Sequence, residues 1–118
     1  MTFDLIRTTA LSLPHVTEEF PFDQRTLVFK VGGKMFLLID INSQDAVTLK
    51  SKPDQIPELL ESHDWMSRGF HMNKNHWITL RLDTLQVDIT LVLELITESY
   101  AIVYQGLTKK ARNAFENR

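Results

Sequence analysis

The sequence has 118 residues, of which 43% are hydrophobic and 24% are charged, with a formal net charge of −2 at pH 7. This length suits one hydrophobic core, so we expect a single domain over residues 1–118. The absence of cysteine excludes disulfides, thiolate catalysis and cysteine-based zinc sites. The net negative charge excludes a protein whose whole surface serves nucleic-acid binding, so any such contact needs a local patch.

The sequence also bears on where the protein resides. It contains no run of about 18 apolar residues, the length that a membrane-spanning helix needs. The first residues lack the basic stretch and the apolar stretch of a secretory signal. We therefore expect a cytoplasmic protein with no membrane contact, and a monomer as the default.

The N-terminal region predicts a helix followed by an edge strand. Phe3, Ile6 and Ala10 repeat at helical spacing after Thr2, which can cap the helix. Residues 16–23 are short and interrupted by Pro21, which is typical of an edge strand that leads into a turn. The carboxylates of this region would suit a cation site, although acids at such a position are more often solvated.

Gly32 and Gly33 lie between two β-rich runs, 27–31 and 34–41, and predict a hairpin with a two-residue primed turn. Both faces of the hairpin are largely apolar, so these are expected to be central strands, covered at least in part on both sides. The predicted register pairs Val31 with Lys34, Phe29 with Phe36 and Leu27 with Leu38, and it places Val28, Lys30, Met35, Leu37 and Ile39 on the opposite face.

A third strand and a second helix are expected next. Residues 46–50 alternate, with Val47 and Leu49 inward and Thr48 and Lys50 outward. The helix is expected to open near Pro53 or somewhat later and to be buried through Ile56, Leu59 and Leu60.

The C-terminal part predicts one more strand and two helices. Residues 77–82 alternate, which sends Ile78, Leu80 and Leu82 to the core. Residues 87–104 carry an apolar stripe at helical spacing, Gly106 is a natural stop, and Thr108 can cap a short last helix.

One window stands out by its charge. Residues 65–82 contain no acid, yet they include Arg68, His71, Lys74, His76 and Arg81. A local positive excess in a net-acidic protein is typical of contact with a polyanion. Within the window, residues 71–77 gather histidine, asparagine, lysine and tryptophan, a grouping suited to phosphate contact and base stacking.

These observations predict one nucleic-acid-binding surface. If residues 77–82 join the same sheet as residues 46–50, then Thr48, Lys50, Thr79 and Arg81 share a face with the ring of Trp77. The candidate nucleic-acid-binding residues are Lys30, Lys34, Lys50, Arg68, His71, Asn73, Lys74, His76, Trp77 and Arg81.

Other interpretations of the same residues remain open. His71 and His76 are five positions apart, which suits neither a strand nor a helix for joint metal ligation, so we expect no metal site. No nucleophile elbow, phosphate loop or dinucleotide fingerprint occurs, so we expect neither an enzyme nor a cofactor. Asn73 can serve a turn, and Trp77 can simply pack.

The chain resembles the MmcQ/YjbR-like family of small bacterial proteins, commonly labelled DNA-binding. The resemblance spans nearly the full length and depends above all on His71-Met72-Asn73-Lys74 and His76-Trp77, supported by Phe20-Pro21-Phe22 and by residues 28–36. It implies an α+β fold similar to the frataxin homologue CyaY, sometimes described as a double wing, with an antiparallel sheet flanked by helices. His15 and Asp23 stand where glycine is typical of the family, so those turns are expected to differ.

From these observations we expect weak, largely sequence-independent DNA binding through the surface around residues 71–77. The alternative is a module of the same fold that binds a protein or a small ligand. A basic surface patch would favour DNA, and a pocket around His71 and Trp77 would favour the alternative.

Overall fold

The computed structural model describes residues 2–69 and 72–116, and these form an antiparallel six-stranded sheet with four helices. The predicted α+β class is confirmed. The strand order is β1-β2-β3-β4-β6-β5. In chain order the elements are α1 (Thr2–Ser12), β1 (Val16–Glu19), β2 (Thr26–Val31), β3 (Lys34–Asp40), β4 (Ala46–Lys50), α2 (Ile56–Ser62), β5 (Met66–Arg68), β6 (Trp77–Arg81), α3 (Ile89–Gln105) and α4 (Lys109–Glu116).

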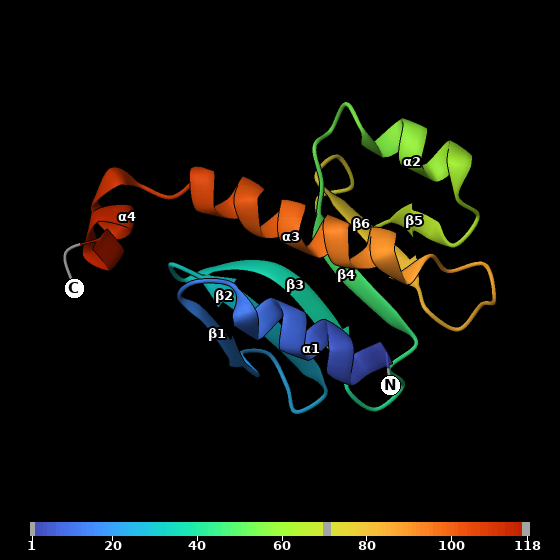
Figure 1. The fold of residues 1–118 in the computed structure, drawn as a ribbon, viewed down its shortest axis with the longest axis horizontal. Coiled ribbons are helices and arrows are strands. Elements are labelled where there is room, and N and C mark those ends of the chain that lie inside the picture. Colours follow the sequence, from blue (N-terminus) through green and yellow to red (C-terminus); the bar gives the residue numbers. More distant parts are fainter. Residues whose placement is uncertain (1, 70–71, 117–118) are drawn as a thin grey trace.

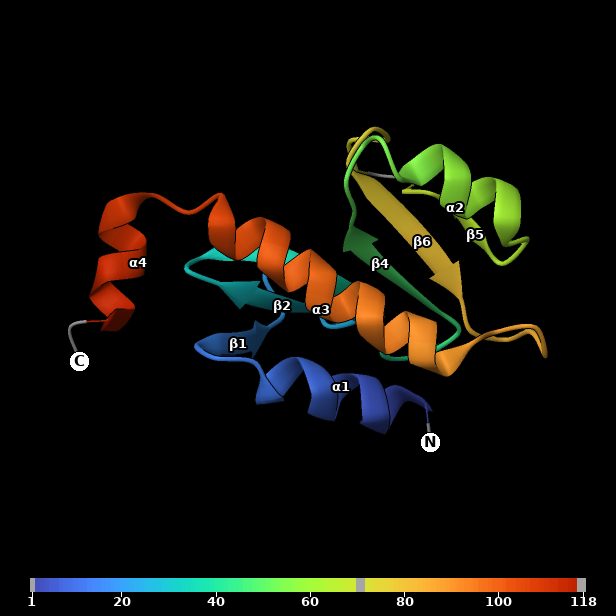
Figure 2. The ribbon, with the colours of Figure 1, turned by 45° about the horizontal axis from the view of Figure 1, so that its top comes forward.

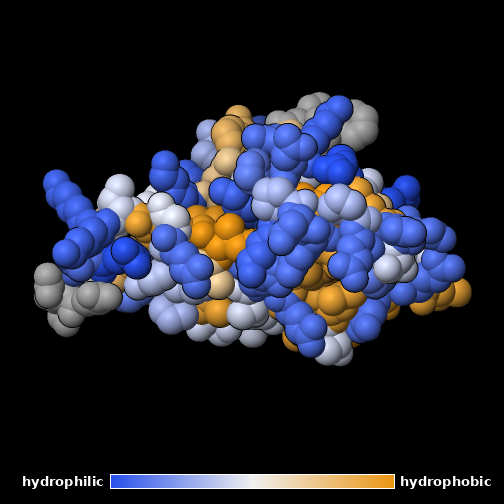
Figure 3. Space-filling view, turned by 90° about the horizontal axis from the view of Figure 1, so that it is seen from above, coloured by the Kyte–Doolittle hydropathy of each residue, from blue (hydrophilic) through white to orange (hydrophobic). Residues whose placement is uncertain are grey.

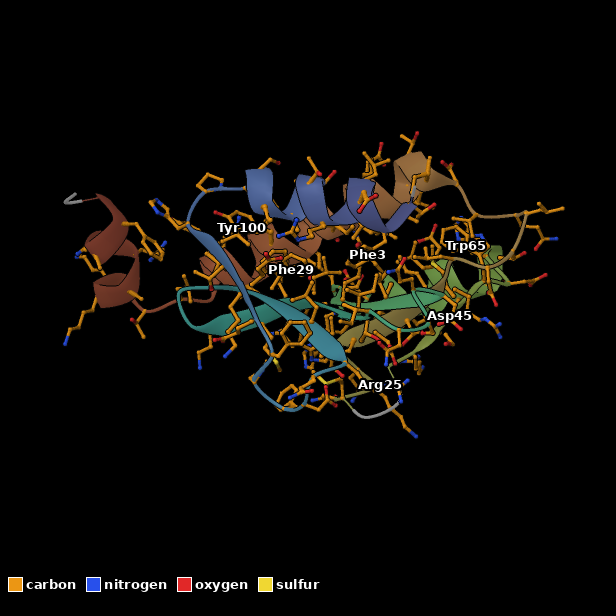
Figure 4. The ribbon with its side chains drawn as sticks, turned by 90° about the horizontal axis from the view of Figure 1, so that it is seen from below. Phe3, Arg25, Phe29, Asp45, Trp65 and Tyr100 are labelled. Atoms are coloured by element: carbon orange, nitrogen blue, oxygen red, sulfur yellow. The ribbon has the colours of Figure 1, made fainter. Side chains whose placement is uncertain are left out.

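Helices cover one face of the sheet. Figure 1 and Figure 2 show α1 and α3 side by side across that face, with α2 over the β5 end of the sheet. In Figure 4, Phe3, Phe29 and Tyr100 lie between the helices and the sheet, whereas Arg25 lies on the other side. We call that other side the open face. It carries alternate residues of the strands, including Val28, Leu38, Thr48 and Thr79.

The hairpin forms as predicted, but its register differs. Gly32 and Gly33 have φ of 59° and 79°, as a primed turn requires, and Val31 pairs with Lys34. Beyond the turn a β-bulge shifts the ladder, so that Phe29 pairs with Leu37 and Leu27 with Ile39. The predicted pairings of Phe29 and Leu27 are therefore wrong, and so is the placement of Leu37 and Ile39 on the face opposite to them.

The bulge has a packing reason. Strict alternation sends neighbouring residues to opposite faces of a sheet. The extra residue in β3 allows both Phe36 and Leu37 to be fully buried in the same hydrophobic core. The burial of two large apolar side chains outweighs one irregular step in the ladder.

Helix α3 bears the predicted stripe. Its buried residues include Val92, Leu95 and Ile96, and Asp88 caps it by accepting a hydrogen bond from the Leu91 N–H at 3.2 Å. The helix therefore begins two residues later than predicted. Buried Ser99 donates to the Phe36 carbonyl at 2.6 Å and accepts from the Lys50 N–H at 2.8 Å. This hydroxyl ties the helix to β3 and β4 at once.

The short elements are less regular. β1 is an edge strand, as predicted, and Thr108 caps α4 by accepting from the Ala111 N–H at 3.1 Å. β5 has only three residues and was not expected from the sequence. His15, before β1, adopts φ of 65° and stacks on Phe115 of α4 with ring centroids 4.1 Å apart.

In Figure 3, the side of the molecule that faces the viewer is largely hydrophilic, with smaller hydrophobic areas between the polar side chains. Among the described residues, no helix combines the length and the apolar character that crossing a bilayer requires.

Candidate nucleic-acid interface

The segment before β6 is held by a dense set of hydrogen bonds. The Asn73 carbonyl accepts from the N–H groups of His76 and Trp77, both at 3.0 Å, while its side-chain oxygen accepts from the Asn75 N–H at 3.0 Å. The Arg68 guanidinium donates to the Lys74 carbonyl at 2.9 Å. Asn73 and Arg68 thus build the turn. His71 was also a candidate, but it lies outside the described residues.

Two further contacts attach this turn to its neighbours. The Gly69 N–H donates to the Trp77 carbonyl and the Ser51 N–H donates to the His76 carbonyl, each at 2.8 Å. His76 is half-buried and Trp77 is only 8% exposed. The burial of Trp77 contradicts the expected aromatic stacking surface, because the ring is not free to contact a base.

Two of the candidate cations are held by carboxylates. Arg81 donates to both Asp83 oxygens, at 3.2 and 2.8 Å. These hydrogen bonds raise the pKa of Arg81 and lower the pKa of Asp83. Lys30 lies 2.5 Å from a Glu19 carboxylate oxygen. Lys30 and Arg81 therefore offer less charge to a phosphate than the sequence suggested.

The remaining cations occupy one end of the sheet. β3 begins with Lys34 and β4 ends with Lys50, and antiparallel pairing brings these two ends together. Lys50 pairs with Trp77, so Lys74 in the turn before β6 lies at the same end. Lys34, Lys50 and Lys74 form no salt bridge within the part of the chain that the structure describes.

Acids occupy the opposite end. Each of five strands has a cation at or beside one end and an aspartate at or beside the other, and the order reverses with strand direction. We call the two groups the basic end and the acidic end. The basic end comprises Lys30, Lys34, Lys50, Lys52, Arg68 and Lys74, and the acidic end comprises Asp23, Asp40, Asp45, Asp64 and Asp83.

Several groups at the acidic end are tied to their own loops. Asp23 accepts from the backbone N–H groups of Thr26 and Arg25, which lower its pKa. Asp40 accepts from the backbone N–H groups of Asn42 and Ser43, and Arg25 donates to its other oxygen at 2.7 Å. These contacts also lower the pKa of Asp40, that to Asn42 most strongly.

The described histidine and acidic side chains do not gather into a metal site. Over residues 2–69 and 72–116, no group of three or more histidine or acidic side chains has an arrangement that could hold a metal ion. The early carboxylates considered for a cation site are engaged elsewhere, since Glu18 pairs with Arg7 and Glu19 with Lys30.

Sequence reasoning missed Lys52 and the acidic end. Lys52 is exposed in the turn after β4, two positions beyond Lys50. The signal was present in the sequence, because the sign at the start of the four strands that neighbour one another in the sheet, β2, β3, β4 and β6, alternates: Asp23, Lys34, Asp45 and Lys74. In an antiparallel sheet such alternation places like charges together.

Comparison with known proteins gives consistent matches. Residues 11–102 match the family model described as YjbR. The chain is 34% identical over 102 residues to a protein named YbdF from Escherichia coli O157:H7, covering 86% of this chain and 83% of that protein. It is 26% identical over 84 residues to YjbR from Escherichia coli K12, covering 70% and 71%.

Solved structures show the same architecture. The crystal structure of Deinococcus radiodurans protein DR2400 superposes with a TM-score of 0.88 at 39% identity, covering 97% of this chain and 87% of that one. A protein from Pseudomonas syringae shares the fold with a TM-score of 0.67 at 22% identity, covering 85% and 96%. None of these names states an activity or a ligand.

Proposed function

The chain belongs to the YjbR family, and on that premise we propose that it binds nucleic acid weakly and without strong sequence preference through the basic end of its sheet. The observation that carries this proposal is the placement of Lys34, Lys50 and Lys74 at one end of the sheet, on β3, on β4 and in the turn before β6, with no salt bridge among the described residues. Lysines in such an arrangement suit the phosphates of a backbone.

The chemistry of this end favours phosphate over base contact. Lysine ammonium groups are compact point charges that bind phosphate without reading sequence. Trp77 is buried, and Asn73 and Arg68 bond the turn itself, so few polar or aromatic groups remain to read base edges. The proposed contact is therefore electrostatic and sensitive to salt.

The proposal predicts a specific salt dependence. Three phosphate contacts give a slope of log K against log salt of roughly −2 to −3. Binding of a fluorescein-labelled single strand and of its duplex, measured by anisotropy over a salt series, gives this slope. Lys50→Ala and Lys74→Ala should each make it shallower by about one unit.

Arg81→Ala is the matched control. It removes the same unit of charge, but from the last residue of β6 at the acidic end, where Asp83 already binds the guanidinium. Its slope should equal that of the wild type. If Arg81→Ala and Lys74→Ala reduce the slope equally, the phosphate contact is not located at the basic end. If neither the single strand nor the duplex binds in a salt-dependent way at low ionic strength, the proposal is overturned.

A second candidate function is a small-ligand module of the same fold. It is favoured by a hollow of about 610 Å³ on the open face, bordered by the acidic end. The hollow extends toward the acidic end, so a nucleic acid bound at the basic end would not fill it.

A further inference from the structure

The open face contains a hollow within the range of small-molecule sites. Its volume of about 610 Å³ lies between the roughly 300 and 1,000 Å³ typical of ligand pockets. Figure 4 shows that the segment joining β1 and β2, which ends near Arg25, lies on this side of the sheet, away from α1 and α3. The hollow thus lies between that segment, Met72 and the floor of the sheet.

Part of the floor and one wall are apolar. Leu38 and Ala46 come from adjacent strands, and Phe22 borders the hollow from the β1–β2 segment while being 64% exposed. The segment is braced by the Asp23 carboxylate, which accepts two backbone hydrogen bonds at 2.7 and 2.9 Å. These hydrogen bonds restrain the backbone next to Phe22, whose exposed ring offers a large apolar contact to a ligand.

The centre of the floor is polar but neutral. The hydroxyl groups of Thr48 and Thr79 lie 3.0 Å apart across β4 and β6. One hydroxyl donates to the other, so one O–H donor and several lone pairs are not used by this hydrogen bond. This pair can orient a ligand without selecting its charge.

The charge of the lining is negative. Three aspartates border the hollow, and no lysine, arginine or histidine does so among the described residues. Asp23 and Asp40 are engaged by backbone N–H groups, and Asp40 also accepts from the Arg25 guanidinium at 2.7 Å. The Asp45 carboxylate has neither a hydrogen bond nor a salt bridge to a described residue, and the nearby Arg81 is bound to Asp83.

We propose that this hollow binds a small organic cation, with an apolar body against Phe22 and Leu38 and an ammonium or guanidinium group at Asp45. Charge complementarity favours this class, because an anion would meet three carboxylates, of which only Asp40 has a guanidinium partner, whereas a cation can pair with the exposed Asp45 carboxylate. The site is separate from the basic end and does not depend on nucleic-acid binding.

The test compares two probes of nearly equal size and opposite charge. 3-Phenylpropylamine and 3-phenylpropionate are titrated into ¹⁵N-labelled full-length protein, and amide shifts are followed by NMR. The amine should shift Ala46, Thr48 and Thr79 saturably, with a dissociation constant on the order of 1 mM for a ligand of this size. The carboxylate should leave these amides unchanged.

A charge-neutralising variant locates the cation. Asp45→Asn should weaken amine binding by about two- to fivefold, because Asp45 is exposed, whereas Asp54→Asn, which removes an exposed carboxylate outside the hollow, should leave it unchanged. Equal shifts with both probes, shifts confined to residues outside the hollow, or equal effects of the two variants would each overturn the proposal. None of these outcomes bears on the salt-dependent binding of nucleic acid.

Discussion

A Cβ atom on Gly69 would come within 2.8 Å of the Cβ of Trp77, closer than side chains approach one another in proteins. The Gly69 N–H also donates to the Trp77 carbonyl. Gly69→Ala should therefore lower the free energy of unfolding by about 1–3 kcal/mol, the usual cost of overpacking. Urea denaturation followed by tryptophan fluorescence measures this loss.

Gly106→Ala is the control for that substitution. Its φ of −83° suits any residue, and an added Cβ would meet ordinary contacts at 3.5 Å. This variant should be neutral or slightly more stable, because alanine restricts the unfolded chain. A loss at Gly106 as large as at Gly69 would contradict the packing explanation.

The two glycines of the hairpin should differ in their sensitivity. Both have positive φ, which costs alanine about 1 kcal/mol. A Cβ on Gly33 meets nothing within 4 Å, whereas one on Gly32 would lie 2.6 Å from the buried side chain of Leu107. Gly32→Ala should therefore lower the thermal midpoint more than Gly33→Ala, and equal midpoints would argue against this contact.

The Ser99 hydroxyl should contribute to the free energy of unfolding, because it bonds two strands from within α3. Ser99→Ala leaves the Phe36 carbonyl and the Lys50 N–H without this partner in a buried layer. Such a loss costs about 1–3 kcal/mol. Thr97→Ala, which removes an exposed hydroxyl that bonds within the same helix, should cost less, since water can replace it. Chemical denaturation of both variants makes the comparison.

Asp40 should make stability depend on acid pH. Backbone N–H groups and Arg25 lower its pKa in the folded state, so its contribution is complete above its unfolded pKa of about 3.9. That contribution is lost as the pH falls through the lower folded pKa. Asp40→Asn should flatten the decline of stability below about pH 4 relative to wild type, as measured by denaturation midpoints over a pH series.

The fold could be predicted where a pattern is long or its turn chemistry is specific. Gly32-Gly33 and the stripe of α3 are such cases. The bulge could not be predicted, because it arises from the burial of two consecutive residues, Phe36 and Leu37, in one core. β5 was missed because three residues cannot display an alternation.

The candidate site was predictable in position but not in detail. Like charges gather at the sheet end because of strand order, and the lysines were visible in the sequence. The salt bridge between Arg81 and Asp83 could also have been predicted, because Asp83 follows directly after the acid-free window. The burial of Trp77 depends on tertiary packing around Gly69, which alternation along a strand does not reveal.

The two outermost strands disfavour edge-to-edge association of molecules at high concentration. β1 has four residues and carries Glu18 and Glu19, while β5 has three and ends in Arg68. A neighbouring molecule that docked on either strand would gain only a short ladder and would meet charged side chains. The sheet is therefore a poor template for fibre growth, even though its interior strands are rich in β-branched and aromatic residues.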